Sequence, residues 1–301
     1  MPRQATQYAF CDGVGSNPSF YVGNDSKILH FFNWYKDLCL KRNQVLIVTG
    51  QKGSGKSTLI SYCHNFIENK ANYALLETKK LYDLISGFGK LPKANTFWVA
   101  NSDIRALNGS YIDILCNTIK RNTIKHKVAK YIGNITSSIS QGAGGPETSL
   151  SITPQILSRN QTMQDLSGYL LRNSSKLYIV WFQSLPERCC DDLLRIHHEL
   201  MSVGARNLGI VISVDGEVTI DECETSCDRI HIDPLNIAEL STLLAKVCEA
   251  NDIRYDIEIS EAIIRGGCAT YYDAIKLLQT VEKQDQSYIS LERIQTIMGG
   301  K

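Results

Sequence analysis

Residues 44–58 read Gln-Val-Leu-Ile-Val-Thr-Gly-Gln-Lys-Gly-Ser-Gly-Lys-Ser-Thr, and the rest of the chain is interpreted around them. Gly50, Gly55, Lys56 and Ser57 occupy every fixed position of the G-x-x-x-x-G-K-[ST] phosphate-binding loop. The apolar run before this loop predicts a buried strand, and apolar residues at helical spacing after it predict a helix. We therefore expect the strand–loop–helix context that the motif requires.

The residue types in this loop suit the geometry of phosphate. Glycines let successive backbone N–H groups point into one concavity, which the positive end of the following helix dipole also faces. Lys56 is expected to reach the β- and γ-phosphates, Ser57 to bind Mg²⁺, and Thr58 to support the α-phosphate side. The alternative is a glycine-rich turn that binds nothing, but both flanks and all fixed positions match the motif. The residues predicted to bind a nucleoside triphosphate are Gly50, Gln51, Lys52, Gly53, Ser54, Gly55, Lys56, Ser57 and Thr58.

The bulk composition is that of an ordinary globular protein. The chain has 301 residues, of which 43% are hydrophobic and 21% charged, so it can form a sizeable core in one large or two smaller domains. Lys and Arg number 32 against 31 Asp and Glu, a balance that gives no general affinity for nucleic acid or acidic membranes. The longest purely apolar run, 177–182, is too short to span a bilayer, and residues 1–10 lack a secretory signal pattern. These features predict a cytoplasmic protein.

The ten cysteines are scattered along the chain. Several, such as Cys63 and Cys248, stand at helical core positions, which is typical of reduced, buried thiols. Cys223, Cys227 and His231 are spaced as zinc ligands on one helical face would be, but proline and strand signals follow at once. A zinc site is therefore the weaker interpretation.

Strand and helix patterns alternate through the first three quarters of the chain. A helix capped by Asp25 or Ser26 is expected to run to about Arg42. The predicted strands are 45–48, 73–76, 96–100, 177–182, 209–214 and 230–232, and the later predicted helices are 81–88, 110–131, 161–172 and one beginning at 185. Alternation of apolar strands with helices predicts an α/β fold with a parallel sheet covered on both faces.

After Pro234 the sequence predicts helices only, at 238–250, 260–265, 271–282 and 290–298. We place a domain boundary there, with an α/β domain over 1–232 and a helical domain over 233–301. Residues 133–155 are rich in Gly, Ser and Thr and predict a flexible insertion in the first domain. The basic stretch 120–130 is either a solvated helix face or a contact surface for nucleic-acid phosphates.

A phosphate-binding loop in an α/β core followed by a small helical lid resembles the AAA+ ATPases, and most closely their clade of origin-recognition, transposition and ExeA-like ATPases. The entrance 17–21 (Asn-Pro-Ser-Phe-Tyr), which lies near the adenine in that family, and the junction 230–235 (Ile-His-Ile-Asp-Pro-Leu) before Glu239-Leu240 carry the likeness beyond the loop. The resemblance covers most of residues 17–297. It implies a three-layer αβα P-loop NTPase core with a parallel sheet and an all-helical lid. It also implies ATP and Mg²⁺ as ligands and makes a homo- or hetero-oligomer possible, since members of the family often form rings or filaments.

The chain departs from the family at its second acidic motif, an apolar strand that ends in Asp-Glu. The corresponding residues are Val180 and Trp181, or Phe182 and Gln183 on a shifted alignment, so neither alignment supplies a carboxylate. In the family the Asp holds Mg²⁺ and the Glu activates the attacking water. Carboxylates from elsewhere are the alternative, and the candidates considered are Asp103, Asp191 and Asp192.

The residues that sense nucleotide in the family are also altered. The lid's arginine motif corresponds to Gly267-Cys268-Ala269-Thr270, which contains no arginine, and Arg265 precedes it. The resemblance offers Ser213 as the polar residue at the end of the fourth strand. Arg188 and Arg206 are weak candidates for an arginine finger, because arginines near helix ends are usually surface residues.

Three functions follow from these observations. The first is an ATP-binding AAA+-like protein in which nucleotide acts as a conformational or assembly switch with weak or absent hydrolysis. The alternative is an active AAA+ ATPase that acts on DNA or on a macromolecular assembly. The third is an interaction module with a vestigial site. In each case the expected partner is a macromolecule, and DNA is the first that the resemblance suggests.

Overall fold

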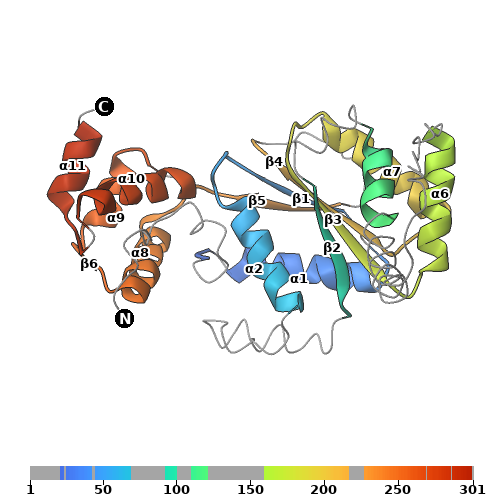
Figure 1. Ribbon diagram of the computed structural model, residues 1–301, viewed down its shortest axis with the longest axis horizontal. Coiled ribbons are helices and arrows are strands. Elements are labelled where there is room, and N and C mark those ends of the chain that lie inside the picture. Colours follow the sequence, from blue (N-terminus) through green and yellow to red (C-terminus); the bar gives the residue numbers. More distant parts are fainter. Residues whose placement is uncertain are drawn as a thin grey trace, which may run out of the picture.

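The computed structural model describes residues 21–23, 25–42, 45–68, 92–99, 110–120, 159–216, 227–268, 270–285 and 287–299. Five strands form the main sheet (Figure 1): β1 (Val45–Gly50), β2 (Ala94–Val99), β3 (Leu177–Leu185), β4 (Leu208–Val214) and β5 (Asp228–Ile232). The helices around it are α1 (Asp25–Cys39), α2 (Lys56–Glu68), an unlabelled helix over 111–120, α6 (Arg159–Arg172) and α7 (Cys189–Ser202).

All five strands are parallel, in the order β2-β3-β4-β1-β5. β1 is therefore an interior strand and lies between β4 and β5, with Val48 opposite both Ser213 and Ile230. The phosphate-binding loop leaves the carboxyl end of β1, next to the carboxyl end of β4. In parallel α/β sheets, ligands bind at this edge.

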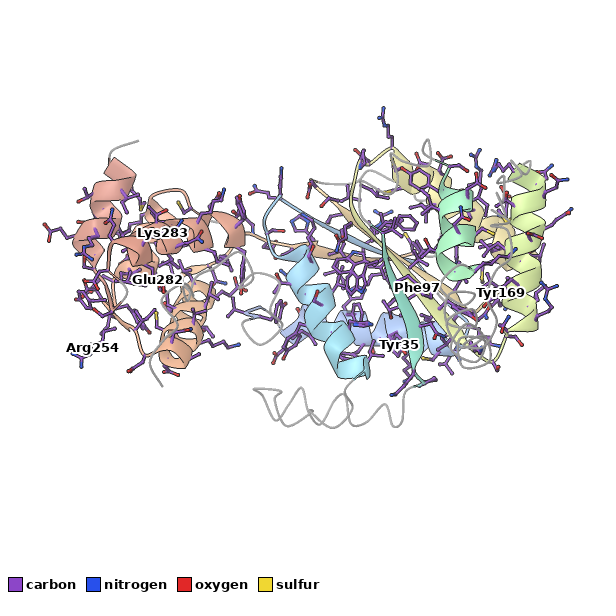
Figure 2. All side chains as sticks on the ribbon, in the orientation of Figure 1. Tyr35, Phe97, Tyr169, Arg254, Glu282 and Lys283 are labelled. Atoms are coloured by element: carbon purple, nitrogen blue, oxygen red, sulfur yellow. The ribbon has the colours of Figure 1, made fainter. Side chains whose placement is uncertain are left out.

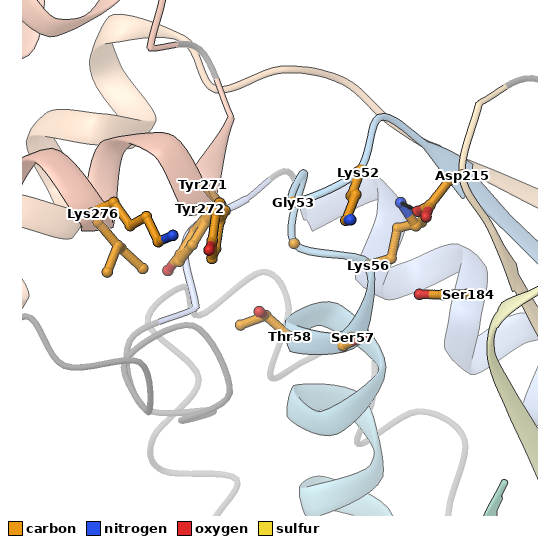
Figure 3. A pocket seen from close by; sticks show the side chains of 12 residues that line it. Lys52, Gly53, Lys56, Ser57, Thr58, Ser184, Asp215, Tyr271, Tyr272 and Lys276 are labelled. Carbon is orange, nitrogen blue, oxygen red and sulfur yellow. Dashed lines mark ion pairs between the residues drawn. The ribbon is translucent and has the colours of Figure 1, made fainter. Parts of the chain in front are cut away.

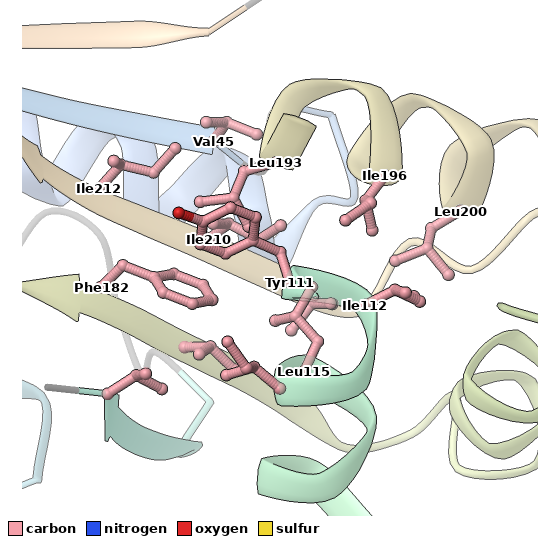
Figure 4. Close-up of a cluster of buried hydrophobic side chains, with 14 of the residues drawn as sticks. Val45, Tyr111, Ile112, Leu115, Phe182, Leu193, Ile196, Leu200, Ile210 and Ile212 are labelled. Carbon is pink, nitrogen blue, oxygen red and sulfur yellow. The ribbon is translucent and has the colours of Figure 1, made fainter. Parts of the chain in front are cut away.

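The three interior strands, β1, β3 and β4, are largely apolar on both faces because helices cover both faces. Alternate residues of one strand consequently belong to different cores: Val180 and Phe182 face one cluster, while Ile179 and Trp181 face the other. The first cluster lies beneath α6, α7 and the helix over 111–120 (Figure 4). The second cluster lies beneath α1 and α2.

The side chains of α1 anchor it firmly to the sheet. Trp34, Tyr35 and Leu38 are fully buried. The Tyr35 hydroxyl donates to the carbonyl of Pro92 at 2.5 Å, which ties the helix to the segment that enters β2. In Figure 2, Tyr35 and Phe97 lie in the sheet part of the molecule, whereas Glu282 and Arg254 lie in the helical part.

The C-terminal part contains α8 (Ile237–Asn251), α9 (Ile259–Arg265), α10 (Tyr271–Gln284) and α11 (Leu291–Gly299). A capping box starts α8: Asn236 accepts from the N–H of Glu239, and Glu239 accepts from the N–H of Asn236. These helices pack around a third apolar cluster, which Val22 of the N-terminal segment also joins.

The fold class predicted from the sequence is confirmed as α/β with a parallel sheet followed by a helical region. The prediction of helices only after Pro234 was incomplete, because β6 (Arg254–Tyr255) and β7 (Tyr288–Ile289) form a short parallel pair there. Two residues per strand are too few to produce an alternating sequence pattern.

Several predictions concern residues outside those that the structure describes. They are the strand 73–76, the helix 81–88, the insertion 133–155, Asp103 and most of the basic stretch 120–130. In the described part of the chain, no helix has the length and apolar character needed to cross a membrane.

Candidate nucleotide site

The loop between β1 and α2 depends on glycine at particular positions. Gly50 has φ of 144° and Gly53 has φ of 81°, both in the region that side-chain-bearing residues rarely adopt. A Cβ on Gly50 would lie 2.5 Å from the Ile232 carbonyl oxygen, and one on Gly53 would lie 2.7 Å from Cβ of Tyr272. Both backbone conformation and close packing therefore require glycine in this loop.

Lys56, the first residue of α2, is almost fully buried at 5% exposure. Its Nζ donates to the carbonyls of Gly50 and Gln51, at 2.8 Å each. The same Nζ forms an ion pair with Oδ1 of Asp215, also at 2.8 Å. The lysine is thus folded back over its own loop and held by three oxygen atoms (Figure 3).

Asp215 follows β4 immediately and was not among the candidate residues predicted from the sequence. Its position is set by an antiparallel bridge, in which Gly50 N–H donates to Gly216 O at 3.2 Å and Gly216 N–H donates to Gly50 O at 3.0 Å. A sequence signal existed, because an acidic residue directly after a buried parallel strand lies at the ligand-binding edge of the sheet.

A cavity of about 360 Å³ opens between the loop and the helical region, a size typical of small-ligand sites. Figure 3 shows Lys52, Lys56 and Asp215 on one side and Tyr271, Tyr272 and Lys276 of α10 on the other. The full lining is Lys52, Gly53, Gly55, Lys56, Ser57, Thr58, Ser184, Asp215, Tyr271, Tyr272, Ile275 and Lys276.

The loop and α10 are directly joined. The Tyr272 N–H donates to the Gly53 carbonyl at 3.0 Å, and the Lys276 ammonium lies 4.5 Å from the centre of the Tyr272 ring. Tyr271 is buried against the loop, and burial raises the pKa of its hydroxyl well above the usual range. The first residues of α10 therefore close the cavity from the helical side.

A second, smaller hollow lies on the other side of the loop and is lined by Tyr21, Val22 and Gly23 of the N-terminal segment. The Ser54 hydroxyl borders this hollow and is buried, with no hydrogen-bond partner in the described part of the chain. Lys246 of α8 donates to the Tyr21 carbonyl at 2.6 Å and fixes the segment in place. An oriented, buried hydroxyl beside a glycine loop is chemically suited to a polar ligand.

The structure divides the nine predicted loop residues between the larger cavity, the smaller hollow and the carbonyls that hold Lys56. Six of the nine line the larger cavity, while Gly50 and Gln51 supply carbonyls to Lys56 and Ser54 borders the smaller hollow.

The end of β3 places no carboxylate in the cavity. Val180, Trp181 and Phe182 are buried in the two cores, and Ser184 is the β3 residue that lines the cavity. The Trp181 indole N–H donates to the Ser213 hydroxyl at 2.8 Å, inside the protein. Ser213, a candidate polar residue from the resemblance, therefore points to Trp181 and is not part of the cavity wall.

The other candidate residues lie elsewhere. Asp191 and Asp192 are in the first turn of α7, away from the cavity lining, and Asp192 accepts from Arg195 at 2.7 Å. Arg188 and Arg206 are exposed, and Arg265 pairs with Glu261 on the surface of α9. The structure thus does not bring these residues to the loop.

Two further sequence features can be located in part. Lys120, the first of the basic stretch, pairs with Asp165 at 2.7 Å. His231 contacts the Thr49 hydroxyl through Nδ1 at 3.0 Å, and no group of three potential metal ligands occurs among the described residues. Cys63 and Cys248 are fully buried, and burial raises the pKa of the Cys63 thiol.

No family model matches the chain, and no curated protein matches it. Solved structures match along almost its whole length. The Drosophila ORC bound to DNA matches with a TM-score of 0.56 at 10% identity, over 98% of this chain and 67% of that one. The Walker-type ATPase of Pyrococcus abyssi matches with a TM-score of 0.53 at 12% identity, over 96% and 75%.

The ORC1 protein of Aeropyrum pernix in complex with DNA gives a TM-score of 0.50 at 12% identity, over 97% of this chain and 68% of that one. Identities this low establish the fold alone. The chain has the fold of AAA+ ATPases, with the strand order β2-β3-β4-β1-β5 and a C-terminal helical region.

Proposed function

We propose that this chain is an AAA+-like ATP-binding protein in which nucleotide acts as a conformational or assembly switch, with weak or absent hydrolysis. One observation carries the proposal. A complete phosphate-binding loop and the start of α10 enclose one cavity and are joined by the Tyr272–Gly53 hydrogen bond. A ligand in that cavity contacts both the sheet domain and the helical lid, whose boundary we place at about residue 233. Its binding energy then favours one arrangement of the two.

The residues present fit ATP. Lys56 supplies a buried cation at the amino end of α2, and the glycines let the loop backbone approach an anion closely. The Ser54 hydroxyl, which has no hydrogen-bond partner among the described residues, is suited to a hydrogen bond with a polar group of the ligand. The Ser57 hydroxyl would hold Mg²⁺, which would neutralise charge on the phosphates. These residues bind and orient the triphosphate.

Weak hydrolysis is expected because β3 contributes no carboxylate to the cavity. An attacking water needs a carboxylate that orients it and accepts its proton. The β3 residue at the cavity is Ser184, and its neighbours Val180 to Phe182 are packed in the core. Binding of ATP is then favoured over its cleavage.

The test is equilibrium binding of Mg-ATP together with single-turnover hydrolysis by the purified protein. Lys56→Ala should weaken binding at least about tenfold, because a charge-assisted hydrogen bond to phosphate contributes about 1.5–3 kcal/mol. Lys176→Ala is the matched control, since Lys176 is an exposed lysine that does not line the cavity. Binding without turnover supports the switch. Absence of binding by the unaltered protein contradicts it.

The second candidate is an active ATPase that acts on DNA or on a macromolecular assembly. Asp215 favours it, because a carboxylate does stand at the loop although it comes from β4. Turnover that Lys56→Ala abolishes would establish this function in place of the switch.

DNA is the first partner to test, since two of the matching structures are of proteins bound to DNA. Salt-dependent DNA binding that is lost on reversing the charges of Lys125 and Lys127 would support it. If the charge reversals leave DNA binding unchanged, the basic stretch 120–130 does not contact DNA. A ring or filament assembly stays a prediction, to be tested by the mass of the protein in solution with and without ATP.

A further inference from the structure

Asp215 is the acidic group in the described cavity wall, and the phosphate-binding motif does not account for it. Its backbone is fixed twice: β4 runs in register beside β1, and Gly216 is bridged to Gly50 by two hydrogen bonds. The backbone of Asp215 is therefore held beside the loop. Its side chain is 38% exposed and borders the cavity.

The contact that Asp215 makes conflicts with the binding of phosphate. Its Oδ1 lies 2.8 Å from Nζ of Lys56, the same atom that is expected to contact the β- and γ-phosphates. If the phosphates bind the ammonium of Lys56, the Asp215 carboxylate loses its ion pair and lies next to the negatively charged phosphates. Like charges a few ångströms apart near a protein surface repel appreciably, so this arrangement disfavours the free triphosphate.

A divalent cation removes the conflict. Mg²⁺ binds oxygen atoms, usually one or two protein oxygens together with phosphates and water. The Asp215 carboxylate and the Ser57 hydroxyl both line the cavity, whereas β3 contributes only Ser184 there. In the described part of the cavity wall, Asp215 is the only carboxylate.

We propose that Asp215 makes nucleotide binding depend on divalent cations: it pairs with Lys56 when no nucleotide is bound, and it becomes the carboxylate partner of Mg²⁺ when Mg-ATP enters. The inference rests on the proposed function, because it concerns how the same cavity accepts a triphosphate. The inference places the carboxylate that binds Mg²⁺ directly after β4, because β3 has no carboxylate at the cavity.

The test measures the affinity of a fluorescent ATP analogue in excess EDTA and in excess MgCl₂. The unaltered protein should bind at least about tenfold more tightly with Mg²⁺. In Asp215→Asn, affinity in EDTA should rise, affinity in Mg²⁺ should fall, and the ratio of the two should approach one. The substitution keeps the shape of the side chain, and a melting curve verifies that the variant is folded.

Asp191→Asn is the matched control, because Asp191 is an exposed carboxylate on α7 that does not line the cavity. It should keep the ratio of the unaltered protein. If Asp215→Asn keeps that ratio too, or if the unaltered protein binds equally well with and without Mg²⁺, the inference is wrong and the proposed function stands. If the unaltered protein binds no nucleotide under either condition, both fail.

Discussion

Replacement of Gly53 by alanine tests whether the loop and the lid act together. Gly53 has φ of 81°, and its added Cβ would lie 2.7 Å from Cβ of Tyr272, closer than real Cβ contacts come. The new methyl group must push α10 away, which breaks the hydrogen bond from Tyr272 N–H to Gly53 O. We expect the closed arrangement of loop and lid to be lost.

The magnitude can be worked from these contacts. The left-handed backbone costs an alanine about 1–2 kcal/mol of folding stability. The broken hydrogen bond adds about 1 kcal/mol, and the overpacked contact adds about 1 kcal/mol more. The broken hydrogen bond and the overpacked contact also weaken nucleotide binding, because a ligand in the cavity must bring the loop and α10 back into contact. Together they predict an affinity for Mg-ATP that is reduced about 30-fold.

Gly267→Ala is the control that separates the two effects. Gly267 has φ of 84°, almost the same as Gly53, but nothing lies within 4 Å of an added Cβ. It should lose about 1–2 kcal/mol of stability in chemical denaturation. Its affinity for Mg-ATP should stay within about threefold of the unaltered protein. The reasoning is refuted if Gly53→Ala binds as well as Gly267→Ala.

Three further predictions concern the stability of the part of the chain that contains the main sheet. Trp181→Phe removes the indole donor to Ser213 and should lower the free energy of unfolding by about 1–3 kcal/mol, with a double-mutant cycle against Ser213→Ala giving a coupling of about 1 kcal/mol. Asn207→Ala should cost about 2–3 kcal/mol in urea denaturation, because the buried amide donates toward three backbone carbonyls between α6 and β3; a loss below about 0.5 kcal/mol would contradict it. Burial lowers the pKa of His197 to about 4 from its ordinary value of 6.5. Between these two pH values the unfolded chain binds a proton at His197 that the folded chain does not, so the free energy of unfolding should fall as the pH drops from 6.5 to about 4. His197→Gln should make this dependence of stability on pH less steep.

The central part of the fold could be predicted from the sequence because its signals are local. The spacing of Gly50, Gly55 and Lys56 identifies the loop, and the apolar run in β3 identifies a buried strand without knowledge of its neighbours. The same holds for the helices of the C-terminal part, whose apolar residues recur at helical spacing. The short strands β6 and β7 carry no such pattern, since each depends on a partner more than thirty residues away.

The chemistry of the site was less predictable because it depends on register. Asp215 meets Lys56 only because β4 lies next to β1, an order that no local pattern encodes. Ser213, two residues earlier, is still inside β4, where its buried hydroxyl accepts from the Trp181 indole. Val214, the last residue of β4, is buried in the core, whereas the next residue, Asp215, lines the cavity. Sequence reasoning therefore reached the end of β4 but named Ser213 there and not Asp215.

The N-terminal segment has a consequence for how the chain folds. Tyr21 packs in the core beneath α1 and α2, whereas its neighbour Val22 packs among the helices of the C-terminal part. Val22 precedes the last of those helices by more than two hundred residues and is therefore synthesised much earlier. Its contact with these helices has one of the largest sequence separations in the protein. Docking of the segment must wait until the C-terminal helices have emerged. We expect the sheet to form first during synthesis, with this junction among the last parts to close.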